Sequence, residues 1–148
     1  KANFLSGVEI GEFYISAIKM NHPDGGAAYK IQCDDKTLVY ATDNELRPPE
    51  SHHSHNFDEW VRFCDRADLL IHDAQYIDAE MGHKLGWGHS SISDTLNLAE
   101  LAGVKLLCLF SHDPKRTDEQ LDDLTAKLLV EKPPFSFFFA KEERSINL

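Results

Sequence analysis

The sequence predicts an α/β domain of the layered α+β type, in which helices flank a mixed β-sheet. Two patterns carry this prediction. Up to Glu45, short segments of alternating apolar and polar residues are separated by turn residues, as in a β-meander. From Phe57 onward, short apolar runs alternate with segments whose apolar residues recur every three or four positions. The 148 residues, 42% of them hydrophobic, are enough for one core, so we expect a single domain over residues 1–148.

Four strands are expected in the meander. The first two are joined by Gly11-Glu12, a two-residue connection typical of a hairpin. The second ends at His22-Pro23, because proline cannot donate to a sheet and biases the residue before it toward an extended backbone. Turn residues then separate the last two strands. The expected strands cover residues 8–10, 13–20, 27–33 and 37–41.

The second part of the chain is expected to alternate strands and helices. Apolar runs too short for a helix indicate buried strands, and apolar residues at three- and four-residue spacing indicate helices. Gly103 ends one helix, and Thr117 with Gln120 predicts a capping box at the start of another. The expected order is helix 57–66, strand 69–71, an irregular loop with three glycines, helix 93–102, strand 105–110, helix 117–130 and strand 135–139.

Composition and charge disfavour several classes of protein. A formal net charge of −10 disfavours a general nucleic-acid-binding surface, although a local basic pocket could hold one phosphate. No apolar run approaches the roughly 18 residues of a membrane span, and the first residues lack the pattern of a signal peptide. We therefore expect a cytoplasmic protein without a membrane partner. Residue 1 is lysine and need not be the native start.

The cysteines and one histidine-rich loop favour structural roles. Cys33, Cys64 and Cys108 form no CxxC pair and lie within or beside apolar segments, which favours reduced, buried thiols. The loop 46–56 holds a further group of histidines, at positions 52, 53 and 55. We favour a solvated loop over a metal site there, because no aspartate follows the last two histidines at the right offset.

Four expected strands lead into a residue that can bind a metal or transfer a proton: His22, Asp43, Asp73 and His112. In an open α/β sheet, functional residues gather outside the carboxyl ends of the strands. Imidazole and carboxylate together suit a divalent ion such as zinc, and a carboxylate can bridge two ions. His89 follows the glycine-containing loop, and we expect it to meet Asp73 at this edge. The residues therefore indicate metal-assisted hydrolysis.

Five motifs in order resemble the metallo-β-lactamase-fold hydrolases, specifically the branch of ribonuclease Z and related phosphodiesterases. The motifs are NHPDGGAAYKI, LVYATDNE, ADLLIHDAQY, GWGHSS and LFSHDP, within a match that runs from about Phe13 to Leu121. The resemblance implies two divalent metal ions, zinc first and manganese or iron as alternatives, that activate a bridging hydroxide. It makes His22 a terminal ligand of one ion, Asp43 the bridge, and His112 a terminal ligand of the other.

The same resemblance assigns the proton transfer and the substrate contacts. His89 matches the catalytic histidine of this branch and Asp73 the acidic residue that orients it, so His89 is expected to protonate the leaving alkoxide. Trp87 and Ser90 are the candidate substrate-binding residues. Trp87 could stack on a base or pack against the protein, and packing is slightly favoured.

One motif of the family is absent. The HxHxDH segment, which supplies further ligands to both metals, does not occur, and the run from His53 to Asp58 imitates it only superficially. We therefore expect the carboxyl-terminal half of an αββα sandwich, with an incomplete ligand set and no activity on its own. Such a half should form oligomers or bind the missing amino-terminal half.

Two other functions stay open. The chain could be a non-catalytic or assembly half-module without metals, or a hydrolase of the same fold that acts on lactams or thioesters. For the phosphodiesterase, tRNA precursors, cyclic nucleotides and small phosphodiesters are all compatible substrates. A small phosphodiester or nucleotide is favoured over RNA, because no long basic insertion is present to hold tRNA.

Overall fold

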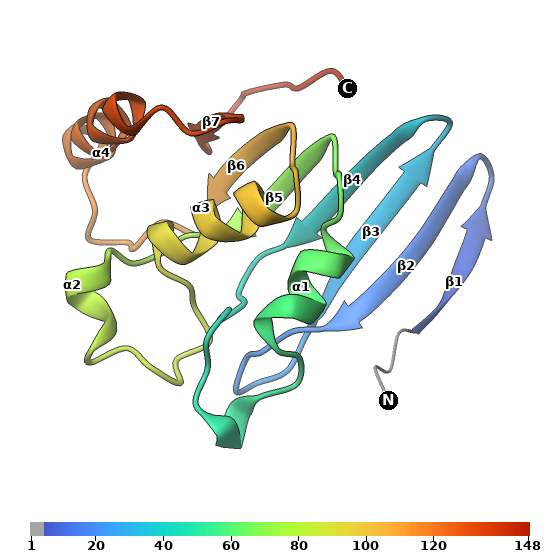
Figure 1. The fold of residues 1–148 in the computed structure, drawn as a ribbon, viewed down its shortest axis with the longest axis horizontal. Coiled ribbons are helices and arrows are strands. Elements are labelled where there is room, and N and C mark those ends of the chain that lie inside the picture. The colour runs from blue at the N-terminus through green and yellow to red at the C-terminus, as the bar shows by residue number, and fades with distance from the viewer. Residues whose placement is uncertain (1–4) are drawn as a thin grey trace.

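The computed structural model describes residues 5–148, so the first four residues of the expected domain lie outside it. Within these described residues, seven strands form one sheet in sequence order (Figure 1). The strands are β1 Leu5–Ile10, β2 Phe13–Lys19, β3 Ala27–Cys33, β4 Lys36–Ala41, β5 Leu69–Asp73, β6 Leu106–Phe110 and β7 Ser136–Phe139. The helices are the 3-10 turn η1 Glu50–His52, α1 Phe57–Phe63, α2 Asp78–Met81, α3 Ile92–Leu101 and α4 Asp118–Glu131.

The directions of the strands bring most carboxyl ends to one edge. Strands β1 to β4 pair antiparallel, and β4 to β7 pair parallel. As a result β2, β4, β5, β6 and β7 all run the same way, and the residues that follow them converge on one edge of the sheet. The predicted mixed sheet with flanking helices is confirmed.

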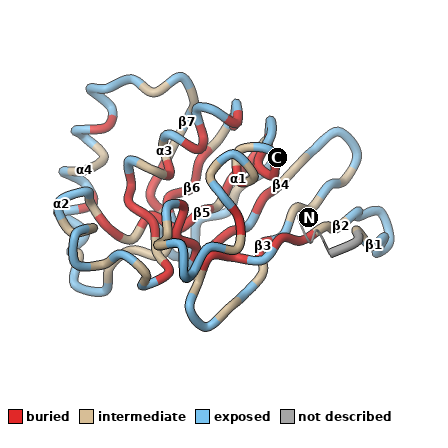
Figure 2. The backbone as a smooth tube through the Cα atoms, turned by 60° about the horizontal axis from the view of Figure 1, so that its bottom comes forward, coloured by how far each residue is buried: buried red, intermediate tan, exposed pale blue. Residues whose placement is uncertain are grey.

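The main core lies between one face of the sheet and the helices. Val39, Leu70 and Leu107 from three adjacent strands pack there with Trp60 of α1 and Leu98 of α3. In Figure 2 the buried backbone is concentrated in the central strands and α3, whereas the β1–β2 hairpin is largely exposed. The strand residues of this core alternate with residues that point to the opposite face of the sheet.

The opposite face is apolar and partly exposed. On this face, Val8 is paired with Ile15, Tyr29 with Tyr40, and Ile10 with Phe13 across neighbouring strands. The carboxyl-terminal segment covers only its β5–β7 end, where Ile146 packs on a small cluster and Arg144 lies over Phe138. We call the exposed remainder the open face, defined by Val8, Ile10, Phe13, Tyr29, Tyr40 and Phe110.

Local signals in the sequence explain where most helices begin. The predicted capping box at Thr117 and Gln120 is present, and a second one joins Asn56 to Glu59 at the start of α1. Helix α1 ends at Phe63, three residues before the predicted end. The backbone of Arg66 is left-handed, with φ of 48°, and its N–H donates to the Ala102 carbonyl, so the chain has turned toward β5 by this point.

Three further expectations need correction. Strand β5 does not end at residue 71 but includes His72 and Asp73, because both still pair with β6. The loop after β5 contains the short helix α2, which the sequence pattern did not indicate. The histidine-rich loop is exposed at His52 and His53, as expected, but His55 is buried against Trp60. Among residues 5–148, no helix is both long and apolar enough to cross a bilayer.

Candidate functional site

The candidate site centres on Asp43, Asp73 and His89. In the described chain these three are the one group of three or more potential metal-binding residues whose ligand atoms all lie within 4.8 Å of one another. His89 Nδ1 lies 2.6 Å from Asp73 Oδ2 and 3.9 Å from Asp43 Oδ1. Asp43 follows β4, Asp73 ends β5, and His89 precedes α3. The structure therefore brings together three residues that the sequence singled out.

Asp73 is held rigidly beneath His89. Its side chain is fully buried, and its second oxygen, Oδ1, accepts backbone N–H groups from Ser90 at 2.9 Å and Gln75 at 3.2 Å. Because these amides fix the carboxylate, Asp73 can orient the imidazole of His89 without moving.

The surrounding carboxylates favour the protonated form of His89. Burial alone would lower the pKa of His89. The hydrogen bond to Asp73 and the negative charges of Asp73, Asp43 and Glu45 outweigh burial, so the pKa of His89 is raised above its usual value of 6.5. A histidine that donates from Nδ1 to a buried carboxylate keeps Nε2–H free to act as an acid.

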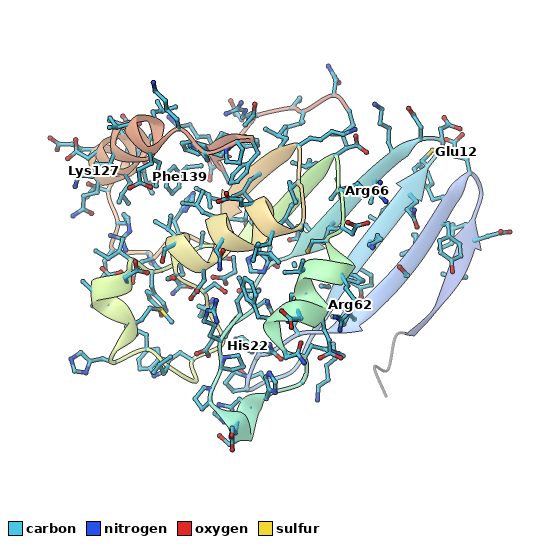
Figure 3. The ribbon with its side chains drawn as sticks, viewed as in Figure 1. Glu12, His22, Arg62, Arg66, Lys127 and Phe139 are labelled. Atoms are coloured by element: carbon cyan, nitrogen blue, oxygen red, sulfur yellow. The ribbon has the colours of Figure 1, made fainter. Side chains whose placement is uncertain are left out.

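His22 reaches the same edge from β2 (Figure 3). Its ring lies edge-on to that of His89, with 5.6 Å between the centroids, and packs directly on Gly88. His22 Nδ1 accepts the backbone N–H of Asp24 at 3.2 Å, which places the proton of a neutral ring on Nε2. That proton must leave or the ring must turn before Nε2 can bind a metal.

His112 follows β6 and presents a bare nitrogen. Its Nε2–H donates to the Ala140 carbonyl at 3.2 Å, and burial lowers the pKa of the ring. Its Nδ1 is buried without a hydrogen-bond partner in the described part of the chain. A neutral imidazole with an unshared lone pair is the form that binds a metal ion.

The donor atoms at this edge fit divalent metal ions in chemical type. Asp43 offers a solvent-accessible carboxylate from a left-handed backbone, with φ of 53°, and His112 offers its bare Nδ1. His22 lies within the same loop cluster, but its Nδ1 already accepts the N–H of Asp24. The assignment of His22, Asp43 and His112 as ligands stays a prediction, as do the proposed roles of His89 and Asp73.

The two candidate substrate-binding residues differ in their surroundings. Trp87 is 56% exposed, and Lys84 Nζ lies 3.9 Å from its ring centroid, so the side chain is only partly packed. Its role in substrate binding stays a prediction. Ser90 is buried. Its hydroxyl donates to the Asn44 carbonyl at 2.6 Å and accepts the N–H of Leu46 at 3.0 Å. A substrate contact would require the Ser90 hydroxyl to leave these backbone partners.

Sequence reasoning missed a buried polar scaffold behind the site. Asn21 links three loops: its N–H donates to Asn44 Oδ1, and its amide bonds the backbone of Glu45 and His55. Asn44 Nδ2 also contacts Nε2 of the fully buried His72 at 3.2 Å. These residues lie within the motifs quoted above, and that was the one signal in the sequence for a structural role. The signal was not used because polar side chains at strand ends are ordinarily solvated.

The chain is similar to known proteins over most of its own length but not of theirs. No family model matches it. Ribonuclease Z of Halalkalibacterium halodurans is 27% identical over 130 residues, which are 79% of this chain and 42% of that protein. The metallo-β-lactamase fold protein YhfI of Bacillus subtilis superposes with a TM-score of 0.68 at 20% identity, over 92% of this chain and 49% of YhfI. The short form of human tRNase Z gives a TM-score of 0.64 at 20% identity, over 95% and 45%.

These similarities establish the fold of the chain and a likeness to one kind of protein that has it. The chain has the metallo-β-lactamase fold and resembles ribonuclease Z, as its motifs predicted. It spans less than half the length of each of these three proteins.

Proposed function

From this fold and the likeness to ribonuclease Z, we propose that the chain supplies half of the active site of a metal-dependent phosphodiesterase. The observation that carries the proposal is the His89–Asp73 hydrogen bond of 2.6 Å, formed beside Asp43 at the edge where the strands end. A buried carboxylate that orients a protonated imidazole is the arrangement that general acid catalysis requires.

The proposed reaction assigns each residue a physical task. His89 donates the Nε2 proton to the leaving alkoxide of the diester, while Asp73 holds the ring through Nδ1 and balances the charge. Although burial lowers the pKa of His89, the hydrogen bond to Asp73 and the nearby carboxylates raise it overall, which favours the protonated ring that a general acid needs. Asp43, His22 and His112 would hold the metal ions. Two such ions supply Lewis-acid activation of water and of the phosphoryl oxygens.

The general acid distinguishes this proposal from a thioesterase. An alkoxide is a strongly basic leaving group and needs a proton as the phosphorus–oxygen bond breaks, whereas a thiolate leaves without one. The His89–Asp73 pair would have little purpose in thioester hydrolysis. A half-module kept only for assembly would make no catalytic use of the pair.

We further propose that the open face packs against the sheet of an amino-terminal half. The face is an apolar surface on β1 to β4 and β6 that includes Val8, Tyr29 and Tyr40. Burying about 400 Å² of it would contribute roughly 10 kcal/mol at about 25 cal/mol per Å², comparable to the stability of a whole domain. A second copy of the chain is the alternative occupant.

The same half would complete the metal site. His22 with Asp43, and Asp43 with His112, give each ion two protein ligands, whereas a catalytic zinc ordinarily has three. The isolated chain should therefore bind metal weakly and be inactive. We propose a cytoplasmic enzyme that acts on a small phosphodiester or nucleotide, with RNA as the alternative substrate suggested by the ribonuclease Z relatives.

The test compares the isolated chain with a protein that joins it to an amino-terminal segment bearing HxHxDH. Elemental analysis should find two equivalents of zinc, manganese or iron in the joined protein and far less in the isolated chain. The joined protein should hydrolyse bis-p-nitrophenyl phosphate and leave a chromogenic lactam unchanged. Hydrolysis of the lactam alone would support the lactamase alternative, and two metals without any hydrolysis would support the non-catalytic one.

A further inference from the structure

Glu45 places a buried carboxylate under the loop that leads to His89. Only 1% of Glu45 is exposed. The N–H of Gly86 lies 2.9 Å from Oε1 and 3.0 Å from Oε2, and the N–H of Gly88 donates to Oε2 at 3.0 Å. The backbone amides on both sides of Trp87 thus converge on a single side chain that the sequence analysis did not single out.

The hydrogen bonds from these two amides offset the large electrostatic cost of burying the Glu45 carboxylate. A carboxylate removed from water is strongly destabilised unless charge-assisted hydrogen bonds replace its hydration. Among residues 5–148, Glu45 takes part in none of the side-chain ion pairs, so the two glycine amides are direct hydrogen-bond partners that compensate its lost hydration. Two nearby amides, from Gly86 and Gly88, point at one anion, whereas the N–H of Trp87 between them donates to the Lys84 carbonyl. Amides can converge on an anion in this way only in a particular loop conformation.

The loop conformation in turn depends on that carboxylate. Gly86 and Gly88 have φ of 83° and 90°, a region that glycine occupies readily but does not require. The hydrogen bonds to Glu45 favour these angles. In the conformation that results, Trp87 is exposed and His89 meets Asp73.

Glu45 is itself held in place. Its N–H donates to the Asn21 carbonyl at 3.1 Å, and its carbonyl accepts from Asn21 Nδ2 at 2.9 Å. Asn21 precedes His22, and Glu45 lies two positions after Asp43. One buried group therefore connects the loops of two candidate ligands, His22 and Asp43, to the loop of the candidate general acid.

We propose that Glu45 is a positioning residue, whose carboxylate fixes the turn from Gly86 to Gly88 so that Trp87 faces solvent and His89 meets Asp73. Its structural part stands on the hydrogen bonds alone, and its catalytic part rests on the proposed function of His89. Glu45 does not touch the reacting atoms; it acts through the loop.

The structural part is tested by E45Q, which keeps the shape of the side chain and replaces one acceptor oxygen by an NH₂ donor. In ¹⁵N NMR spectra of the chain, the amide protons of Gly86 and Gly88 should be shifted downfield by the carboxylate and should lose that shift in E45Q. Their hydrogen exchange should accelerate by about tenfold or more, as expected when local opening becomes easier. E100Q, which removes an exposed carboxylate from α3, is the matched control and should change neither amide.

The catalytic part is tested in the joined protein by the dependence on leaving group. E45Q should lower kcat for a poorly activated alkyl diester by about tenfold or more, because a misplaced acid fails where protonation matters. Its kcat for bis-p-nitrophenyl phosphate should fall much less, whereas general damage to the fold would lower both equally.

The outcomes separate the two proposals. Unchanged glycine amides in E45Q would overturn the structural part, and if E45Q does not fold, fast exchange of these amides in the unaltered chain would do the same. Altered amides with full kcat on the alkyl diester would overturn the positioning of His89. A joined protein without phosphodiesterase activity would overturn the proposed function and leave the NMR result standing.

Discussion

His89 donates a hydrogen bond of 2.6 Å to Asp73 across a sequence separation of sixteen residues. The bond depends on two independent placements. Strand β5 delivers Asp73 to the edge of the sheet, and the loop before α3 returns His89 to the same point. The predictions below test this bond, the groups around it and the face on the other side of the sheet.

Loss of His89 should impair the chemical step without emptying the metal site. In the joined protein, His89→Ala should lower turnover of poorly activated diesters by about 10² or more, as expected when a general acid is removed. Metal content measured by elemental analysis should be unchanged. His83→Ala, which alters an exposed histidine of the neighbouring loop, is the control and should retain activity. Full turnover by His89→Ala would exclude the assigned role.

The contribution of His89 to stability should depend on pH in a defined direction. Its pKa is raised from 6.5 on folding, so folding favours the protonated ring. The resulting stabilisation is complete below pH 6.5 and is lost as the pH rises through the folded-state pKa. The free energy of unfolding of the metal-free chain should therefore exceed that of His89→Ala most at acidic pH.

Urea unfolding of both chains between about pH 5 and pH 9 measures this difference. His72 and His112, whose pKa values burial lowers, are present in both chains, so their effects cancel. A difference that is constant or grows with pH would contradict the prediction.

Loss of Asp43 should reduce metal content as well as turnover. Because the proposed bridging carboxylate binds both ions, Asp43→Ala in the joined protein should lower the stoichiometry of both, not of one. Elemental analysis after gel filtration measures this. Asp35→Asn, in the exposed turn between β3 and β4, removes the same charge and should retain both metals. Two metals retained in Asp43→Ala would show that it is not the bridge.

Trp87 should affect binding of nucleotides more than stability. Its side chain is 56% exposed, so Trp87→Ala should change the free energy of unfolding by no more than about 0.5 kcal/mol. KM for a nucleotide diester should rise severalfold with little change in kcat, because base stacking is worth about 1–3 kcal/mol. For bis-p-nitrophenyl phosphate, which has no nucleobase, the increase in KM should be smaller. Equal effects on both substrates would contradict selective stacking of a base on Trp87.

The open face should drive association of the isolated chain. Sedimentation velocity over a dilution series should show dimers or larger species at micromolar concentration, because an uncovered apolar sheet face invites contact. Tyr40→Lys, on this face, should shift the distribution toward monomer. Leu129→Lys, at an exposed position of α4 on the helical side, is the control and should not. A well-folded monomer of the unaltered chain would contradict this prediction.

Local patterns predicted much of the fold because they act over a few residues. The Gly11-Glu12 connection, the capping box at Thr117 and the glycine after α3 each determine a turn or a helix end through hydrogen bonds between near neighbours. The alternation of apolar segments was likewise enough to predict a mixed sheet with helices. The motifs also identified the strand ends that converge on one edge.

Only the tertiary structure decided which polar residues form the candidate site and which ones hold the surrounding loops in place. His72 and Asp73 are adjacent in β5 and therefore point to opposite faces of the sheet. One face buries His72 against Trp60 and Asn44, and the other turns Asp73 toward His89. In the sequence, Glu45 resembles an ordinary carboxylate that follows a strand. The structure shows that the amides of two glycines far away in the sequence donate hydrogen bonds to it. The sequence by itself determined which groups reach the edge, whereas their burial and partners depend on contacts between segments far apart in the chain, which no local pattern encodes.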